Sequence, residues 1–277
     1  MPHGSGSVGR LGIGVRWVEF VQATAGHRTT RVRQAPPVPE PRGGTARQAQ
    51  VIAGAVRWTA VLVLALDTST PAVTAGVAEL AEGVTVLAGR VTIDARAHGE
   101  LITPHVLGAA REAGIALRDL GAIVVGAGPG PFTGLRAGLA TAAALGHALG
   151  VPVHPVCSLD AIACEVTSDE PFTVVTDARR REVYWAAYDA GGRRTDGPHV
   201  QAPADLAVAL AAGDGARQYA ETLGARVVEP YYPSPAGLVT AAREALTSGA
   251  APAPLTPLYL RRPDAVEPGA RKRVTTP

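Results

Sequence analysis

The hydrophobic pattern of the chain becomes regular after a long irregular stretch at the N-terminus. Residues 61–66 form a short, continuous apolar run, which is typical of a buried strand, and Asp67 ends it. Residues 72–80 and 84–93 are rich in β-forming residues and are joined by a Glu-Gly turn at residues 82–83. Together the three segments predict an antiparallel β-meander.

Helices alternate with strands in the segment that follows the meander. Apolar residues at helical spacing predict helices over residues 98–113, 132–149 and 158–166. Buried strands are predicted between the helices, at residues 122–127 and 151–156. The resulting order β-β-β-α-β-α-β-α is that of the ribonuclease H-like or actin-like half-domain. We therefore expect an α/β protein of the actin-like (ASKHA) type, with mixed sheets flanked by helices.

A second unit is predicted to follow, although its pattern is less regular. It is expected to contain strands at residues 172–176, 183–188 and 257–260 and helices at residues 204–212, 216–223 and 236–247. The prediction is thus a two-lobed chain, with an N-terminal lobe at residues 61–170 and a smaller C-terminal lobe at residues 171–262.

The two ends of the chain are predicted to lie outside this fold. Residues 1–60 are rich in Pro, Gly, Arg and Gln and show no sustained periodicity, so they cannot bury enough apolar surface to offset their chain entropy. We expect them to be disordered, or to be an extension upstream of a misplaced translation start. Residues 263–277 are expected to be a basic, disordered tail, which either touches RNA or stays solvated.

Composition narrows the functional classes. The apolar run at residues 60–66 is too short to span a membrane and too far from the N-terminus to be a signal peptide. The two cysteines, Cys157 and Cys164, form no CxxC pair, so neither a disulfide framework nor a structural zinc site is expected. These features favour a reducing compartment, the cytoplasm, and no contact with a membrane.

Charge is unevenly distributed along the sequence. The formal net charge is +2, but the first 60 residues hold eight arginines against two glutamates, so the remaining chain is mildly acidic. Strong nonspecific binding to nucleic acid requires clustered Lys and Arg that displace phosphate counterions. The predicted lobes offer no obvious cluster of this kind.

Two polar loops are candidates for nucleotide contacts. Asp67, Ser69 and Thr70 follow the first strand, where actin-like proteins place a loop whose amides face a phosphate and whose Asp holds Mg²⁺ through water. The alternative is an ordinary turn, because these residue types populate strand ends. Asp214, in a Gly-Asp-Gly-Ala segment, could likewise face a nucleotide base or ribose, or could open a helix.

The helix predicted after the glycine-rich segment 126–134 carries small residues at a regular spacing. Gly134, Gly138, Ala142 and Gly146 recur every four residues and form a nearly bare ridge along one face of the helix. Such a ridge lets another backbone come close. It packs either on the sheet of its own chain or against a helix of another subunit. The glycine-rich segment has no following lysine, so it is not a P-loop.

No metal site is predicted. His98 and His105 stand seven residues apart, about 10 Å along a helix axis, which is too far for one ion. Few acidic residues fall at strand ends before Asp177, whereas the nucleases of this topology need several converging carboxylates.

Several segments resemble the bacterial TsaB (YeaZ) family. They read HGELITPHV, GAGPGPFTGLRAG, TDARRREVYWAAY and PLYLRR, and the likeness runs over residues 61–262. The resemblance implies the two-lobed actin-like fold and a place in the complex that makes N6-threonylcarbamoyladenosine next to the anticodon of tRNA. Pro131 stands where the family usually has Ser, which removes a hydroxyl and a backbone N–H.

The resemblance also implies a non-catalytic role. The catalytic paralogue of that family, TsaD, carries a metal-binding HxxxH pair, but here Ile102 stands four residues after His98. The chain is therefore expected to be a degenerate partner that pairs with itself or with TsaD, joined by a TsaE-type ATPase. It is expected to hold no cofactor of its own, with ATP or ADP only at a subunit interface, and to meet tRNA through the complex.

Site residues follow from the same resemblance. The implied interface residues are Glu100, Leu101, His105, Phe132, Leu135, Arg136, Gly138 and Ala142. Asp67, Ser69 and Thr70 are expected to form a vestigial phosphate loop. The alternative function is a stand-alone actin-like ATPase or small-molecule kinase that acts at Asp67.

Overall fold

The structure is a computed structural model that describes residues 60–249 and 251–261. The predicted N-terminal extension up to residue 59 and the predicted C-terminal tail lie outside the described residues. Within the described ranges, no helix is both long enough and apolar enough to cross a membrane.

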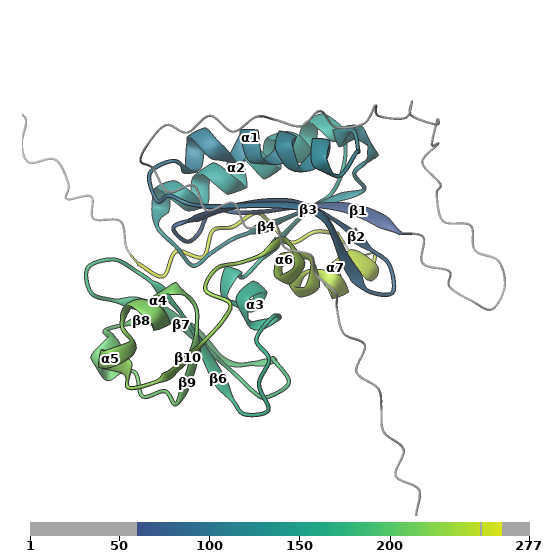
Figure 1. The fold of residues 1–277 in the computed structure, drawn as a ribbon. Helices are drawn as coiled ribbons and strands as arrows, with labels where there is room; N and C mark the ends of the chain where they lie inside the picture. The colour runs from purple at the N-terminus through teal and green to yellow at the C-terminus, as the bar shows by residue number, and fades with distance from the viewer. Residues whose placement is uncertain (1–59, 250, 262–277) are drawn as a thin grey trace, which may run out of the picture. The chain divides into compact units, whose positions relative to one another are not determined.

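The first sheet has five strands in the order β3-β2-β1-β4-β5 (Figure 1). The strands β1 (Val61–Asp67), β2 (Ala72–Leu80) and β3 (Val84–Ile93) form the predicted antiparallel meander. The strands β4 (Ala122–Gly126) and β5 (Val153–Val156) extend the sheet in parallel on the other side of β1. The sheet is therefore mixed, as the alternation of patterns predicts.

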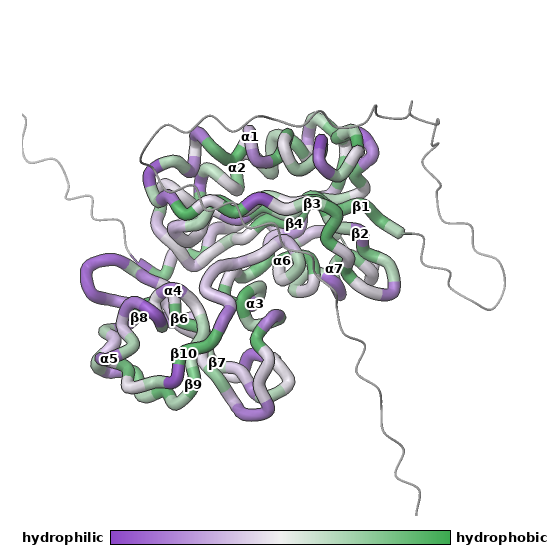
Figure 2. Tube along the Cα trace, in the orientation of Figure 1, coloured by the Kyte–Doolittle hydropathy of each residue, from purple (hydrophilic) through white to green (hydrophobic). Residues whose placement is uncertain are grey.

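Helices cover both faces of this sheet. The helices α1 (His98–Glu112) and α2 (Phe132–Leu149) lie side by side on one face, and α6 (Pro235–Ala241) lies on the other (Figure 1). Along β1, Leu64 points into the core under α1 and α2, whereas Val63 packs with the α6 side. Burial on both faces explains why β1 reads as a continuous apolar run. Figure 2 shows hydrophobic and hydrophilic residues alternating along α1, as expected for a helix with one buried face.

The second sheet also has five strands, in the order β10-β9-β6-β7-β8. Its strands are β6 (Phe172–Asp177), β7 (Val183–Tyr188), β8 (Arg194–Gln201), β9 (Leu210–Ala212) and β10 (Arg226–Val228). The short helices of this part of the chain are α3 (Ser158–Ala163), α4 (Asp214–Gln218) and α5 (Ala220–Leu223). The two mixed sheets flanked by helices confirm the predicted α/β class.

Two predicted elements of this region are wrong. Residues 204–212 are not a helix: a single 3₁₀ turn at Pro203–Asp205 is followed by β9, which is fully buried and pairs in parallel with β6 and β10. Burial between two strands overrides the helix propensity of the alanines there. Residues 257–260 are not a strand: the amide of Leu258 donates to the carbonyl of Ala127, just after β4, and no ladder of strand pairing follows. The strands β8 and β10 had no clear sequence signal.

The chain returns to the first sheet after the second sheet is complete. Residues predicted as one helix at 236–247 form α6 and then α7 (Arg243–Thr247). Ser234 caps α6 by accepting a hydrogen bond from the amide of Gly237. A Cβ atom on Gly76 would lie 2.5 Å from a ring carbon of Pro235, so the glycine lets α6 approach β2 closely.

The small-residue ridge of α2 faces the chain's own lobe. Gly134, Gly138, Ala142 and Gly146 are all buried. A Cβ on Gly138 would lie 2.5 Å from the hydroxyl oxygen of Thr68, and one on Gly146 would lie 2.2 Å from a methyl group of Val153. The interpretation of this ridge as a face open to another subunit is wrong, and the alternative of packing within the lobe is confirmed.

We predict that bulk on the inner face of α2 destabilises the protein. Gly138→Leu should lower the free energy of unfolding by about 3 kcal/mol or more, because the new side chain overlaps Thr68 and outweighs the gain of about 1 kcal/mol from replacing a helical glycine. Urea denaturation measures the loss. The matched control is Ala140→Leu on the exposed face of the same helix, which should change stability by less than about 0.5 kcal/mol. Equal effects of the two substitutions would contradict this packing.

Candidate functional site

The carboxylate of Asp67 is fully enclosed at the end of β1. It is 0% exposed. The amide and the hydroxyl of Ser69 both donate to its Oδ1 at 2.8 Å, and the Ser158 hydroxyl, at the start of α3, donates to its Oδ2 at 2.5 Å. Burial raises the pKa of Asp67, whereas these hydrogen bonds stabilise the carboxylate and act in the opposite direction. Both carboxylate oxygens are thus engaged inside the chain.

The next residue of this loop joins it to α2. The Thr68 hydroxyl donates to the carbonyl of Gly134 at 2.7 Å and accepts from the amide of Gly138 at 3.0 Å. These two backbone groups are the pair that an α-helix normally connects directly. The hydroxyl therefore sits against the first turns of α2, and the glycines leave the space that it needs.

The glycine spacing begins before the helix. A Cβ on Gly126 would lie 1.7 Å from the Asp67 carboxylate, and one on Gly130 would lie 2.2 Å from the carbonyl oxygen of Ser69. With Gly134 and Gly138, four glycines at intervals of four residues contact residues 67–69. The sequence contains this periodicity, but it does not reveal that the loop after β1 is the contacting partner.

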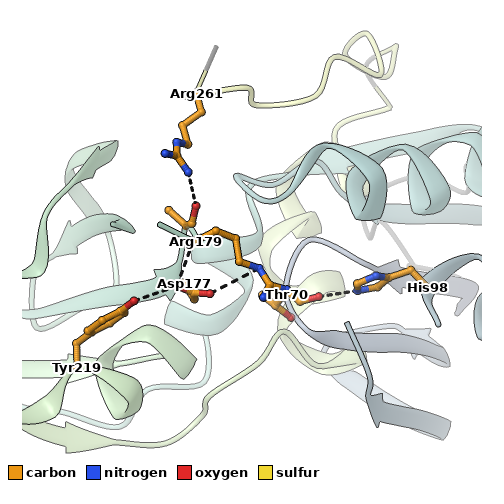
Figure 3. A network of polar contacts seen from close by, with 7 residues as sticks. Thr70, His98, Asp177, Arg179, Tyr219 and Arg261 are labelled. Carbon is orange, nitrogen blue, oxygen red and sulfur yellow. Dashed lines mark hydrogen bonds and ion pairs between the residues drawn. The ribbon is translucent and has the colours of Figure 1, made fainter. Parts of the chain in front are cut away.

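The last residue of the loop is bound by α1. The ring Nε2 of His98, the first residue of α1, lies 2.8 Å from the carbonyl oxygen of Thr70, so Nε2 is the donor (Figure 3). The side chains of Asp67, Ser69 and Thr70 are 0%, 2% and 3% exposed. Asp67 and Ser69 of the loop predicted as a vestigial phosphate site are therefore enclosed within the chain, whereas Thr70 borders a cavity.

The predicted interface residues divide between the two faces of α1 and α2. Glu100 and Arg136 are exposed, and Leu101 and Phe132 are half-buried. The other four, which are buried, are His105, Leu135, Gly138 and Ala142. Because a partner cannot contact buried groups, these four are corrected to residues of the chain's own core.

His105 illustrates the correction. Its Nε2 lies 2.8 Å from the hydroxyl of Thr92 on β3, and burial together with the neighbouring Arg90 lowers the pKa of His105. His98 and His105 thus bind different partners. Among the residues that the structure describes, no group of three His, Cys, Asp or Glu side chains is placed to hold a metal ion.

The exposed face of the two helices carries residues that sequence reasoning missed. On α1, Leu107 is 48% exposed although it is a large apolar residue. The exposed residues of this face are Glu100, Thr103, Pro104 and Leu107 on α1 and Arg136, Ala140, Ala143, Ala144 and His147 on α2. The helical spacing of the sequence contained this information, because residues three, four and seven positions after Glu100 lie on the same side of the helix.

An extended C-terminal segment, residues 255–261, covers the start of α2. Tyr259 stacks on Phe132 with ring centroids 4.2 Å apart, and the Arg136 guanidinium lies 4.0 Å from the same Phe132 centroid. Further along, Arg261 donates to the carbonyl of Ala178 in the β6–β7 loop (Figure 3). The ring stacking and the Arg261 hydrogen bond join residues more than 80 positions apart, so no local sequence pattern could predict them.

Two carboxylates meet at the ends of the adjacent parallel strands β6 and β9. Asp177 accepts a hydrogen bond from Tyr219 at 3.4 Å and pairs with Arg179 at 3.7 Å (Figure 3). Asp214 is 5% exposed, and its Oδ1 has no hydrogen-bond partner among the described residues. Burial raises the pKa of Asp214 to about 7, and the nearby Asp177 carboxylate contributes a smaller part of this shift. Asp214 is the first residue of α4, so the helix-entry interpretation of its motif is correct.

Comparisons with known proteins agree on a family. A model of the family described as "TsaD: tRNA N6-adenosine threonylcarbamoyltransferase" matches residues 91–254, more than half of the chain. A solved structure of YeaZ from Pseudomonas aeruginosa is 30% identical with a TM-score of 0.61, and the match covers 72% of this chain and 100% of that one.

Relatives in other bacteria extend this match. A protein of Mycobacterium tuberculosis is 58% identical over 207 residues, which make up 73% of this chain and 93% of the relative. The tRNA threonylcarbamoyladenosine biosynthesis protein TsaB of Bacillus subtilis is 36% identical over 127 residues, 46% of this chain and 54% of the relative.

We predict that Asp214 makes stability fall as pH rises. The folded protein holds its proton up to about pH 7, whereas the unfolded chain releases it near the ordinary pKa of 3.8. Stability from this group is therefore complete below about pH 4 and is lost as pH rises toward 7, by up to about 4 kcal/mol. Asp214→Asn should remove this decline. The free energy of unfolding of the variant should therefore rise relative to that of the wild type between pH 5 and pH 8.

Urea denaturation at the two pH values measures this difference. Asp205→Asn, at an exposed carboxylate of the 3₁₀ turn before β9, is the control and should follow the wild-type profile. If the free energy of unfolding depended on pH in the same way for the wild type and for Asp214→Asn, the raised pKa of Asp214 would be contradicted.

Proposed function

We propose that this chain, which belongs to the TsaB (YeaZ) family, acts as a non-catalytic partner subunit of the complex that makes N6-threonylcarbamoyladenosine in tRNA. The resemblance in the sequence is confirmed by the family model, the TsaB relatives and the YeaZ structure. Family membership connects the chain to tRNA threonylcarbamoyladenosine biosynthesis. The non-catalytic role is the further step of the proposal.

The closed loop after β1 is the observation that carries this step. In an actin-like phosphotransferase the Asp of this loop needs to reach a metal-bound phosphate. Here the Asp67 carboxylate accepts hydrogen bonds from Ser69 and Ser158 and is 0% exposed. A phosphate could reach it only if α2 and α3 moved apart. The alternative of a stand-alone ATPase or kinase at Asp67 gains no support from this arrangement.

The first helix adds a second argument against catalysis. Ile102 occupies the position, one turn after His98, where a metal-binding HxxxH pair needs its second histidine. It is 1% exposed and packs in the core under α1. His98 itself is bonded to Thr70. The residues present at these positions therefore serve folding.

The exposed faces of α1 and α2 are the proposed partner surface. The two helices lie side by side on one face of the first sheet (Figure 1). Their outward residues include the exposed Leu107 and a row of alanines, Ala140, Ala143 and Ala144, that another helix can approach closely. The core of a protein interface is poor in charge and close-packed, which suits this surface.

The partners and location follow as parts of the same proposal. The TsaD-type catalytic subunit occupies this surface in the assembly, and a second copy of the chain uses it when TsaD is absent. A TsaE-type ATPase joins the complex, with ATP or ADP at a subunit interface and tRNA bound through the assembly. The site of action is the cytoplasm.

We predict that Leu107→Arg abolishes association with the TsaD-type subunit. Placing a charge at the centre of an apolar contact without a partner costs several kcal/mol of binding, so affinity should fall at least about 100-fold. Isothermal titration calorimetry with the purified TsaD-type subunit measures the change, and urea denaturation should show an unchanged fold.

Ala190→Arg is the matched control. It adds the same charge in the exposed turn between β7 and β8, away from α1 and α2, and should bind as the wild type does. Wild-type affinity of Leu107→Arg would exclude this surface as the interface.

A further inference from the structure

The turn between β6 and β7 has a strained backbone. Its three central residues, Arg179, Arg180 and Arg181, have φ angles of 63°, 53° and 62°, in the left-handed region that side chains other than glycine disfavour. All three arginines are exposed, so burial of their side chains does not compensate for the strain. A backbone of this kind persists only where the surrounding structure fixes it from several sides.

Local hydrogen bonds close the turn but do not anchor it to the rest of the chain. The amide of Ala178 donates to the carbonyl of Glu182 at 2.9 Å, and the amide of Glu182 donates to the carbonyl of Arg179 at 3.0 Å. Asp177 accepts from the amide of Arg179 at 3.1 Å, in a bond that is exposed to solvent. All of these partners lie within the turn itself or next to it.

A residue from far along the chain bridges both ends of the same turn. Nη1 of Arg261 donates to the carbonyl of Ala178 at 2.9 Å (Figure 3). Its Nη2 lies 2.9 Å from Oε2 of Glu182, in an ion pair that lacks the alignment of a hydrogen bond. One planar guanidinium group thus contacts the residue before the three strained arginines and the residue after them.

The segment that carries Arg261 is attached to the start of α2. The ring of Tyr259 stacks on that of Phe132, and Nε of Arg136 donates to the Tyr259 hydroxyl at 3.3 Å. Two residues separate Tyr259 from Arg261 along the chain, a span of at most about 7 Å. Residues 255–261 therefore form a strap that runs from α2 to the β6–β7 turn.

We propose that this strap couples partner binding on α2 to the turn of three arginines. The proposal rests on the proposed function, because the partner is the TsaD-type subunit. Tyr259 is 38% exposed, and it stacks on the first residue of the helix whose outer face is the proposed partner surface. The partner covers this ring only while the strap is docked on α2, so its binding favours the docked strap. Arg261 then stays in place across the ends of the turn.

The coupling controls where three positive charges stand. While Arg261 bridges Ala178 and Glu182, the strained backbone between them is fixed, and so are the points from which the three arginine side chains leave it. When the strap leaves α2, the turn loses this bridge and relaxes. A contact on a helix of the first sheet thereby sets the conformation of a turn of the second sheet.

Hydrogen exchange, measured by mass spectrometry on peptides that span residues 177–182 of the full chain, tests the link between the strap and the turn. Arg261→Met keeps the side-chain stem but removes the donors, and it should speed exchange in the turn about tenfold. Tyr259→Ala removes the ring stack and should speed exchange at least about threefold, although Tyr259 is not part of the turn. Tyr259→Phe keeps the stack and should stay close to the wild type.

Arg243→Met is the matched control. Arg243, the first residue of α7, also donates to a backbone carbonyl, that of Glu82, which is not part of the turn. Its replacement should leave exchange at residues 177–182 unchanged. Peptides from the buried strand β1 report global unfolding and should exchange equally in all variants. Wild-type exchange of the turn in either Arg261→Met or Tyr259→Ala would overturn the proposal.

The TsaD-type subunit, added at saturation as checked by calorimetry, tests the coupling. Exchange at residues 177–182 should slow about tenfold in the wild type and should not change in Tyr259→Ala. Equal slowing in both chains would show that the partner acts on the turn without the strap, which refutes the coupling. Binding without any slowing would refute the coupling and leave the partner role intact. A wild-type chain that fails to bind would overturn the partner role, and the coupling with it.

Discussion

The Thr68 hydroxyl, held between the carbonyl of Gly134 and the amide of Gly138, seats α2 directly on the loop that follows β1. This contact requires glycine at both helix positions, because a Cβ at either one would lie within 2.5 Å of Thr68 atoms. Once α2 is seated, the loop is covered and Asp67 has no path to solvent. The position of α2 also fixes which of its faces remains exposed.

The functional consequences follow from that geometry. A closed loop removes the phosphate contact that an actin-like enzyme needs at its first strand, so the same architecture can persist as a binding subunit. The helices that close the loop present their outer faces on one side of the sheet, where Leu107 stands out as an exposed apolar residue. Their first turns meet the β6–β7 loop around the cavity lined by Arg96 and Arg179. One packing arrangement thus underlies both the closed loop at Asp67 and the outer helix faces that we propose as the partner surface.

The sequence was informative wherever local pattern and tertiary environment agreed. The buried strand β1 was predictable because both of its faces lie in a core, and α2 was predictable from its long apolar period. The glycine ridge showed that something approaches α2 closely, but periodicity does not tell one backbone from another. The predicted interface therefore included residues of the buried helix face, among them Gly138 and Ala142. The four-residue spacing of buried positions pointed to a core contact equally well.

The remaining errors concern contacts between distant segments. The alanines around β9 favour a helix locally, and only pairing between β6 and β10 makes them a strand. The stacking of Tyr259 on Phe132 joins the C-terminal segment to α2 without any local signal. The Asp214 oxygen that has no hydrogen-bond partner among residues 60–249 and 251–261 is revealed only when β6 and β9 are placed next to each other. Each of these features depends on tertiary pairing, which composition and period do not encode.

The central claim is that the inner face of α2 serves the chain's own fold and the outer face serves a partner. Site-specific photo-crosslinking tests it most directly, with benzoylphenylalanine at the exposed Ala144 of α2 and, in a second variant, at Tyr231 after β10. With the TsaD-type subunit present, the account predicts a crosslinked heterodimer from position 144 and none from position 231. A crosslink from position 231 alone would contradict it.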